Sequence, residues 1–267
     1  MRLFRIFSLA ILSVNIAYAT IDLTIPLQEL ETNGFTVLHH VLSPQDIQEL
    51  STNFHKAKEK AFHIIEGSPP VVRHFSENNT QNQSIYWKTD RELILQAGKG
   101  RYDFYRGFQD DFFHSDRVLH NQTLEALMRN LMIDEFTNYS GVVHSTVGSL
   151  DQYWHRDTHT LTNFGSDGSK LVTMDDFYFT ILIPITVPFT KENGTTEFLV
   201  GSHRLPSSDF DKCPHAQVEV PLGSVLVFNG KINHRGRANL SDEDRPALYL
   251  VYHKKWYNDQ YRRGVPD

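Results

Sequence analysis

Three side chains and one arginine in the second half of the chain could assemble a metal-dependent oxidation site. His155 and Asp157 are separated by one residue, His234 lies far downstream, and Arg245 follows it at the start of an apolar run. In an extended segment, residues i and i+2 point to the same side, so His155 and Asp157 can reach one metal ion together. Two imidazoles and one carboxylate are the ligands of a well-known class of Fe(II) sites with open coordination positions. The pattern therefore predicts a non-haem iron site.

The His-x-Asp pair is a weak signal by itself. The chain has 14 histidines, so a chance match is expected, and His114-Ser115-Asp116 is a second match. Only the first match is followed at a distance by a histidine after a strand-and-turn pattern and then by an arginine. The guanidinium of Arg245 is planar and always charged, which suits a carboxylate held through two hydrogen bonds. We interpret the second match as the start of a helix, with Ser115 or Asp116 as its cap.

The elements that must position these residues begin with a strand and a helix. The strand is predicted at 33–42. Ser43-Pro44-Gln45-Asp46 then has the serine cap, early proline and third-position acid that begin a helix. Apolar residues recur every three or four positions as far as Ile65, which gives the helix one buried face. Further patterns predict helices at 90–98 and 119–131. Residues 101–106 could form a strand or a loop over a pocket, and a packed strand with solvated arginines is the favoured interpretation.

From Ser140 onward, short β runs alternate with turn residues. Residues 177–187 alternate with the period of two expected of a strand. Residues 225–228 form a short strand that ends at Asn229-Gly230, a dipeptide typical of hairpin turns. Further strands are predicted at 142–147 and 247–253. Helices followed by many short strands predict an α+β, mainly β domain built as a sandwich or barrel.

Composition excludes some classes of protein. A chain of 267 residues suits one large domain. Its net charge of -6 and the absence of a basic stripe argue against nucleic acid as the main partner. The single cysteine, Cys213, excludes an intramolecular disulfide.

The first 19 residues have the pattern of a secretory signal peptide. A basic start, Met1–Arg5, precedes the apolar run 6–17, and Ala17-Tyr18-Ala19 supplies small residues for cleavage. The run is too short for a spanning helix, although a buried or membrane-anchoring N-terminal helix remains an alternative. We expect residues 20–267 to form a single domain, secreted or in the secretory-pathway lumen, with no membrane span after cleavage. Six Asn-x-Ser/Thr sites fit a glycoprotein: Asn78, Asn82, Asn121, Asn138, Asn193 and Asn239.

The chain resembles the phytanoyl-CoA dioxygenase (PhyH) family of Fe(II)/2-oxoglutarate-dependent oxygenases. An early segment, Gly34–Leu38 with Leu42-Ser43-Pro44, is similar to the opening strand and helix of the family. Four later segments match the family pattern in order: Gln152–Asp157, Glu192–Thr196 with Val200–Arg204, Gly223–Phe228 with His234–Asn239, and Arg245. The resemblance touches most of the chain after residue 19 and is densest from about 152 to 253.

The resemblance implies a fold and a set of site residues. The fold is a double-stranded β-helix (a cupin-like jelly roll) flanked by N-terminal helices. By motif position the implied iron ligands are His155, Asp157 and His234, and the implied 2-oxoglutarate contacts are Arg245 with Gln152 and Thr196.

The resemblance also implies an activity. Its cofactors are Fe(II), 2-oxoglutarate and O2. Asp157 occupies a position where halogenating relatives have a small residue, so the chain is expected to hydroxylate an aliphatic C–H of a small-molecule or lipid substrate, releasing succinate and CO2. Asn193 lies in the expected rim of the site, so we expect its glycosylation site to be unused.

Two alternatives stay open at this point. One is a secreted jelly-roll protein that binds a glycan or small ligand without turnover, and the other is a zinc-holding, cupin-like hydrolase. The arginine favours the oxygenase, because a simple binder has no need of a group that holds a carboxylate.

Overall fold

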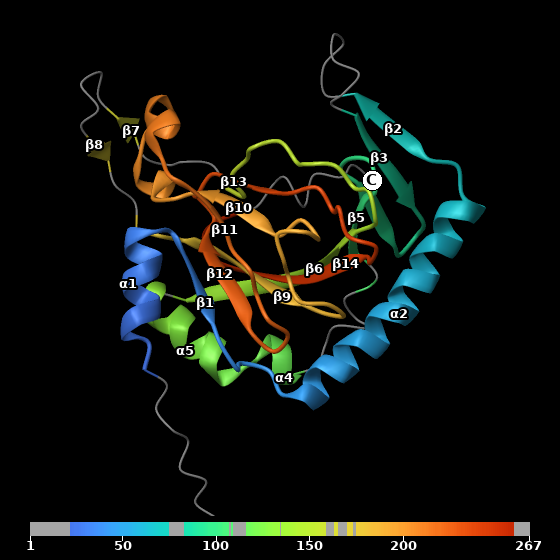
Figure 1. Ribbon diagram of the computed structural model, residues 1–267, viewed down its shortest axis with the longest axis horizontal. Coiled ribbons are helices and arrows are strands. Elements are labelled where there is room, and N and C mark those ends of the chain that lie inside the picture. The colour runs from blue at the N-terminus through green and yellow to red at the C-terminus, as the bar shows by residue number, and fades with distance from the viewer. Residues whose placement is uncertain are drawn as a thin grey trace, which may run out of the picture.

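Two antiparallel sheets enclose the region in which the predicted site residues lie (Figure 1). The computed structural model describes residues 22–74, 83–106, 108, 116–133, 135–158, 163–164, 170–172 and 175–258. The large sheet has nine strands in the order β1 (Phe35–Leu38), β12 (Val225–Asn229), β9 (Tyr178–Pro184), β14 (Arg245–Lys254), β6 (Phe136–Ser145), β5 (Arg101–Arg106), β4 (Leu93–Gln96), β3 (Gln83–Lys88) and β2 (Val71–His74). The small sheet consists of β11 (His215–Gln217), β10 (Thr196–Leu199) and β13 (His234–Gly236), and β7 (Asn163–Phe164) pairs with β8 (Lys170–Val172).

The helices cover one face of the large sheet, and the small sheet lies on the other side (Figure 1). The helices are α1 (Thr24–Thr32), α2 (Pro44–Gly67), α4 (Asp116–Leu119) and α5 (Gln122–Leu131). Their apolar side chains pack with the outward-facing residues of β6, β9, β12 and β14 in one core. The opposite face of these strands packs against the small sheet through Phe198, Leu226 and Phe228. This is the mainly β, α+β jelly roll that the sequence predicted.

The helix predicted from the Ser43 cap is confirmed and extends to Gly67. Its capping box is complete, because the Asp46 amide donates to Ser43 Oγ at 3.2 Å and the Ser43 amide donates to Asp46 Oδ2 at 2.9 Å. The predicted apolar stripe is the buried face, with Leu50, Phe54, Ala57 and Ala61 packed on the sheet. The structure also confirms the elements predicted at the positions of β1, α5, β6, β9 and β14.

The helix predicted at 90–98 is wrong, because this segment forms a turn and then β4. The Thr89 amide donates to the Glu92 carbonyl and the Glu92 amide donates to Thr89 Oγ1, which reverses the chain. The register shifts between Leu93 and Ile94, so both side chains are buried although they are adjacent in sequence. Pairing with β3 and β5 thus overrides a local pattern that resembled a helix.

Two further predictions, for residues 101–106 and for the Asn229-Gly230 turn, need correction. Residues 101–106 form a strand as expected, but Arg101 is buried rather than solvated. The Asn229-Gly230 turn does not close a hairpin. β12 pairs with β1 and β9 in the large sheet, whereas the next strand, β13, pairs with β10 in the small sheet. The turn carries the chain from one sheet to the other, which places His234 opposite the large sheet.

Several sequence predictions lie outside the described residues. These are the signal peptide at 1–19 and the glycosylation sites at Asn78 and Asn82. Among the helices that the structure does describe, none is both long and apolar enough to cross a lipid bilayer.

Candidate metal centre

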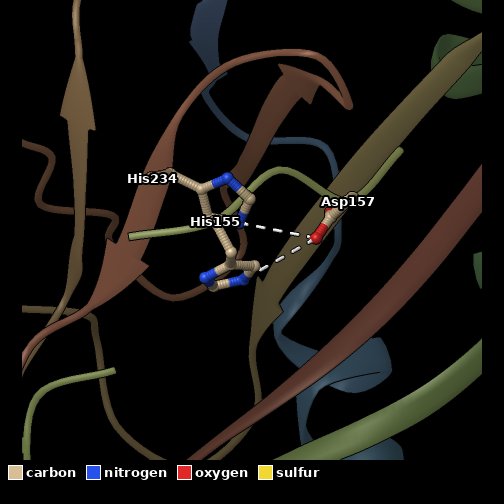
Figure 2. Close-up of side chains that lie close together, drawn as sticks. All are labelled: His155, Asp157 and His234. Atoms are coloured by element: carbon tan, nitrogen blue, oxygen red, sulfur yellow. Dashed lines mark ion pairs between the residues drawn. The ribbon is translucent and has the colours of Figure 1, made fainter. Parts of the chain in front are cut away.

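His155, Asp157 and His234 converge on one point between the two sheets (Figure 2). Asp157 Oδ1 lies 3.9 Å from His155 Nε2 and 3.6 Å from His234 Nε2. All three potential ligand atoms lie within 4.8 Å of one another. This spacing brings two nitrogens and one oxygen to the same side of a prospective ion, as the sequence predicted.

Backbone pairing fixes the two histidines relative to each other. The His155 amide donates to the His234 carbonyl at 3.0 Å, and the His234 amide donates to the His155 carbonyl at 2.9 Å. Asp157 is held at the Gly230 turn, because its amide donates to the Gly230 carbonyl at 3.0 Å. The crossing from the large to the small sheet therefore positions all three side chains at once.

Both imidazoles are oriented by hydrogen bonds on the side away from the site. His155 Nδ1 lies 2.9 Å from the Tyr153 carbonyl, and His234 Nδ1 lies 3.1 Å from the Ile232 carbonyl. A carbonyl only accepts, so each Nδ1 must carry the proton when these bonds form. That tautomer leaves a lone pair on each Nε2, directed at Asp157, as metal ligation requires.

The carboxylate is oriented in the same way. Thr180 Oγ1, on β9, donates to Asp157 Oδ2 at 2.6 Å, which leaves Oδ1 facing the imidazoles.

Burial lowers the pKa of the His234 imidazole to about 4, although Asp157 opposes that shift. His234 is therefore neutral at physiological pH. Two imidazoles and one carboxylate fit a divalent metal of the Fe(II) type. These three residues are called the metal end below.

Arg245 lies at the opposite end of the same cavity. It begins β14 and is 3% exposed, with its Nε donating to the Asn193 carbonyl at 3.1 Å and its Nη2 donating to Ser145 Oγ at 3.0 Å. Burial lowers its pKa to about 9, and the charge of Arg101 adds to the effect. Arg245 remains cationic at neutral pH, with neutral oxygens as its hydrogen-bond acceptors.

A second buried arginine, which the sequence prediction missed as a site residue, lies beside it. Arg101 on β5 donates from Nη1 to the same Ser145 Oγ at 2.6 Å, and from Nη2 to the Leu150 and Arg237 carbonyls. Burial lowers its pKa to about 10, while Asp151 raises it. Two buried cations sharing one hydroxyl repel each other, and an anion bound between them would relieve this repulsion. Arg101, Arg245 and Ser145 are called the arginine end below.

Gln152 and Thr196 also reach the cavity. Gln152 is fixed by Gly236, whose amide donates to Gln152 Oε1 at 2.8 Å. Thr196, on β10, is buried and pairs with Gly236 on β13. A Cβ at Gly236 would lie 2.6 Å from Gln152 Oε1 and 2.9 Å from Arg101 Nη1, so only glycine leaves both side chains in place.

One cavity of about 790 Å³ joins the two ends. All six residues singled out by the sequence line it: His155, Asp157, His234, Arg245, Gln152 and Thr196. Of the second His-x-Asp match, the structure describes only Asp116, which does not line this cavity. Asp116 begins α4 as expected, while His114 and Ser115 lie outside the described residues.

The arrangement has known counterparts. The family model described as "Phytanoyl-CoA dioxygenase (PhyH)" matches residues 30–247. The chain belongs to this family. The match begins within α1 and ends within β14, so it includes both ends of the cavity. Membership of the phytanoyl-CoA dioxygenase family confirms the resemblance that the motifs indicated.

Relatives in sequence and structure agree with the family. The chain is 31% identical over 170 residues to the Fe(II)/2-oxoglutarate-dependent dioxygenase nvfF of Aspergillus novofumigatus, a match that covers 61% of this chain and 54% of that protein. The crystal structure of AviO1 from Streptomyces viridochromogenes Tue57 superposes with a TM-score of 0.63 at 18% identity, covering 90% of this chain and 99% of that one. The epimerase SnoN, in a complex with Fe3+ and alpha ketoglutarate, gives a TM-score of 0.56 at 17% identity over 85% and 81% of the two chains.

The cofactors follow from the family. Phytanoyl-CoA dioxygenases depend on Fe(II) and 2-oxoglutarate, and the cavity of this chain offers a cation site and an anion site that fit these two. The chain spans about half the length of nvfF, 54% of that protein.

Proposed function

We propose that the protein is a non-haem Fe(II)- and 2-oxoglutarate-dependent dioxygenase that hydroxylates an aliphatic C–H of a small-molecule or lipid substrate. The observation that carries this proposal is the pairing of the metal end and the arginine end in one cavity. In the overall reaction one oxygen atom of O2 enters the substrate as a hydroxyl group. The other enters succinate, formed from 2-oxoglutarate with loss of CO2.

The residues divide this work between them. His155, Asp157 and His234 would hold Fe(II), which supplies the redox chemistry that activates O2. Arg245 and Arg101 would bind the far carboxylate of 2-oxoglutarate and fix the molecule along the cavity.

The remaining side chains orient and shield. Thr180 holds the Asp157 carboxylate with one oxygen toward the ion. Thr196 and Gln152 close the side of the cavity formed by the small sheet, and we propose that they contact 2-oxoglutarate. Leu182, Phe228 and Ala247 give the remaining wall an apolar surface that limits the access of water.

The type of reaction is part of the proposal. Solved structures with the same fold include the epimerase SnoN, so the fold alone does not select hydroxylation. The intact carboxylate ligand Asp157 supports hydroxylation over halogenation. A jelly-roll binding protein without turnover is less consistent with the site, because two buried arginines without a carboxylate to bind would be costly.

Anaerobic addition of Fe(II) and 2-oxoglutarate tests the function directly. We expect a weak visible charge-transfer absorption from the chelate, and succinate release when O2 is admitted. Asp157→Ala should abolish both signals. Undiminished succinate release by this variant would contradict the assignment of the metal end, and absence of the absorption in the wild-type protein would favour the binding-protein alternative.

We also propose that the protein enters the secretory pathway, supported by the basic and apolar pattern of residues 1–19. N-terminal sequencing of protein recovered from the medium of expressing cells should begin near Thr20. Of the glycosylation sites in the described region, Asn193 and Asn239 are buried, and each donates its side-chain amide to a backbone carbonyl. Mass spectrometry should therefore find no glycan at either position in folded protein.

A further inference from the structure

One wall of the cavity carries a polar pair that neither the metal nor 2-oxoglutarate uses in the function proposed above. Asp103 follows Arg101 by two residues on β5, and Tyr249 follows Arg245 by four residues on β14. Each therefore faces the same side of the sheet as its arginine. Tyr249 Oη donates to Asp103 Oδ1 at 2.9 Å, and both residues line the cavity.

A glycine makes this pair possible. β6 lies between β14 and β5 in the sheet, and Tyr249 is paired with Gly141 on β6. A Cβ at Gly141 would lie 2.1 Å from Tyr249 Oη. The tyrosine ring therefore lies across bare backbone, and its hydroxyl reaches a residue two strands away. An aromatic ring over a strand glycine also stabilises a sheet, so a test must separate that role from ligand binding.

The chemistry of the pair selects a ligand group. A carboxylate accepts hydrogen bonds at two oxygens, with about four lone-pair positions between them. The Tyr249 hydroxyl donates to Oδ1, and a carboxylate can accept from several donors at once. A hydroxyl or ammonium group can donate to it, whereas a carboxylate or phosphate would be repelled.

The surroundings of the pair are apolar. Val143 and Ala247 face the cavity in the same cross-strand row as Asp103, and Leu182 is paired with Tyr249. A ligand at this position would therefore place an apolar body on the tyrosine ring and aliphatic side chains. Its polar group would reach the carboxylate of Asp103.

We propose that Asp103 and Tyr249 form the substrate-recognition subsite of the cavity, and that it takes an O–H or N–H donor carried on a compact apolar ring. The inference deepens the proposed function and rests on it, because it identifies the occupant as the substrate. It also divides the cavity by charge. The anionic co-substrate goes to the two arginines, and the neutral or cationic substrate group goes to Asp103.

Matched probes test the subsite without knowledge of the natural substrate. The full chain is loaded with Zn(II), as a diamagnetic ion, and with 2-oxoglutarate. Cyclohexanol, its methyl ether and cyclohexanecarboxylate are then titrated by ligand-detected NMR. We expect cyclohexanol to bind about tenfold more tightly than the ether, which cannot donate. The carboxylate should bind more weakly than either.

Variants locate the preference. Asp103→Leu should bring the alcohol-to-ether affinity ratio to about one. Asp103→Asn, which keeps the side-chain shape, and Tyr249→Phe should each lower the ratio severalfold. Asp90→Asn makes the same change of charge at an exposed turn and should leave the ratio unaltered. Gly141→Ala should displace the tyrosine and lower the affinity for all three probes together.

An equal ratio in the wild-type protein and Asp103→Leu, or no preference for the alcohol in the wild-type protein, would overturn the proposal. If Asp103→Leu does not fold, Asp103→Asn and Tyr249→Phe decide the matter by the same ratio. The Fe(II)–2-oxoglutarate absorption, measured on each variant, keeps the two proposals distinguishable. It should persist in Asp103→Leu, and its absence from the wild-type protein would count against the proposed function while leaving the probe ratio valid.

Discussion

The two ends of the cavity differ in charge and in the groups that hold their side chains in place. At the metal end, two imidazoles and a carboxylate point lone pairs at a common position, and each is oriented by a carbonyl or hydroxyl group behind it. At the arginine end, two guanidinium groups share the hydroxyl of Ser145. One end is preorganised for a cation and the other for an anion. A chelating dicarboxylate that bridges the two ends makes contacts at both, so we expect the ends to depend on each other in binding but not in folding.

Removing a ligand at the metal end should have the largest effect. Replacing His234 by alanine removes one of two imidazole donors, so Fe(II) binding should fall below detection and succinate production with it. Isothermal titration with Fe(II) under argon, alongside a succinate assay, measures both. His120→Ala, at an exposed position between α4 and α5, is the matched control and should behave like the wild-type protein.

Changing the arginine end should separate the two functions. Arg245→Met removes a charged donor, so the KM for 2-oxoglutarate should rise about 30- to 100-fold while Fe(II) affinity stays within a few-fold of wild type. Arg101→Met should give an increase of the same kind, whereas Arg91→Met, at an exposed turn, should give none. Steady-state kinetics with varied 2-oxoglutarate decide this. A parallel loss of Fe(II) affinity would show that the ends are not independent in folding.

A smaller effect is expected from changing Thr180, which hydrogen-bonds the candidate ligand Asp157. Thr180→Val keeps the side-chain shape but removes the hydrogen bond to Asp157 Oδ2, so Fe(II) affinity should fall about tenfold with the KM for 2-oxoglutarate little changed. Thr137→Val, at an exposed position of β6, serves as the control. Equal affinity in Thr180→Val and the wild-type protein would mean that Asp157 needs no such support.

The smallest effect is expected from a change at Asp244, which precedes Arg245 in the chain. Asp244, next to Arg245, interacts with His144, Lys58 and the Val147 amide, and these contacts hold the pKa of its carboxyl well below the usual range. A lowered pKa means that the stabilisation is present above about pH 4, the unfolded value, and is lost as pH falls through the folded value.

Asp244→Asn should therefore lower the free energy of unfolding at pH 7 by about 1 kcal/mol, a modest figure because solvent screens this partly exposed group. The corresponding fall in Tm is about 2–4 °C. Thermal unfolding at pH 7 and pH 3 gives the comparison. The difference between variant and wild type should shrink at the lower pH, and a constant difference would exclude the carboxylate charge as its cause.

The two ends also differ in how far the sequence could predict them. The metal end contains a short motif, His155-x-Asp157, and a histidine after a turn, so residue types and spacing sufficed to propose it. Arg101 lies in an unremarkable aromatic and basic strand, and its role depends on β5 pairing with β6 so that Arg101 stands opposite Ser145. Such long-range pairing has no local signal.

The fold shows the same limit. The capping box of α2 and its apolar period were readable because they are local. The segment 90–98 was not, because its strand pairs on both sides with neighbours and contains a bulge. The Asn229-Gly230 turn was recognised as a turn, but the destination of the chain after it depends on which sheet has an open edge.

The reciprocal backbone bridge between His155 and His234 has a consequence for assembly. It joins the segment that follows β6 to the small sheet at one narrow point, and a bound metal ion would connect the same two segments through their side chains. The ion would then act as a cross-link between distant parts of the chain. Because the metal would bind the folded form and not the unfolded chain, the free energy of unfolding would rise with the concentration of free metal. Iron supply would thereby control how long the enzyme survives as well as how fast it turns over.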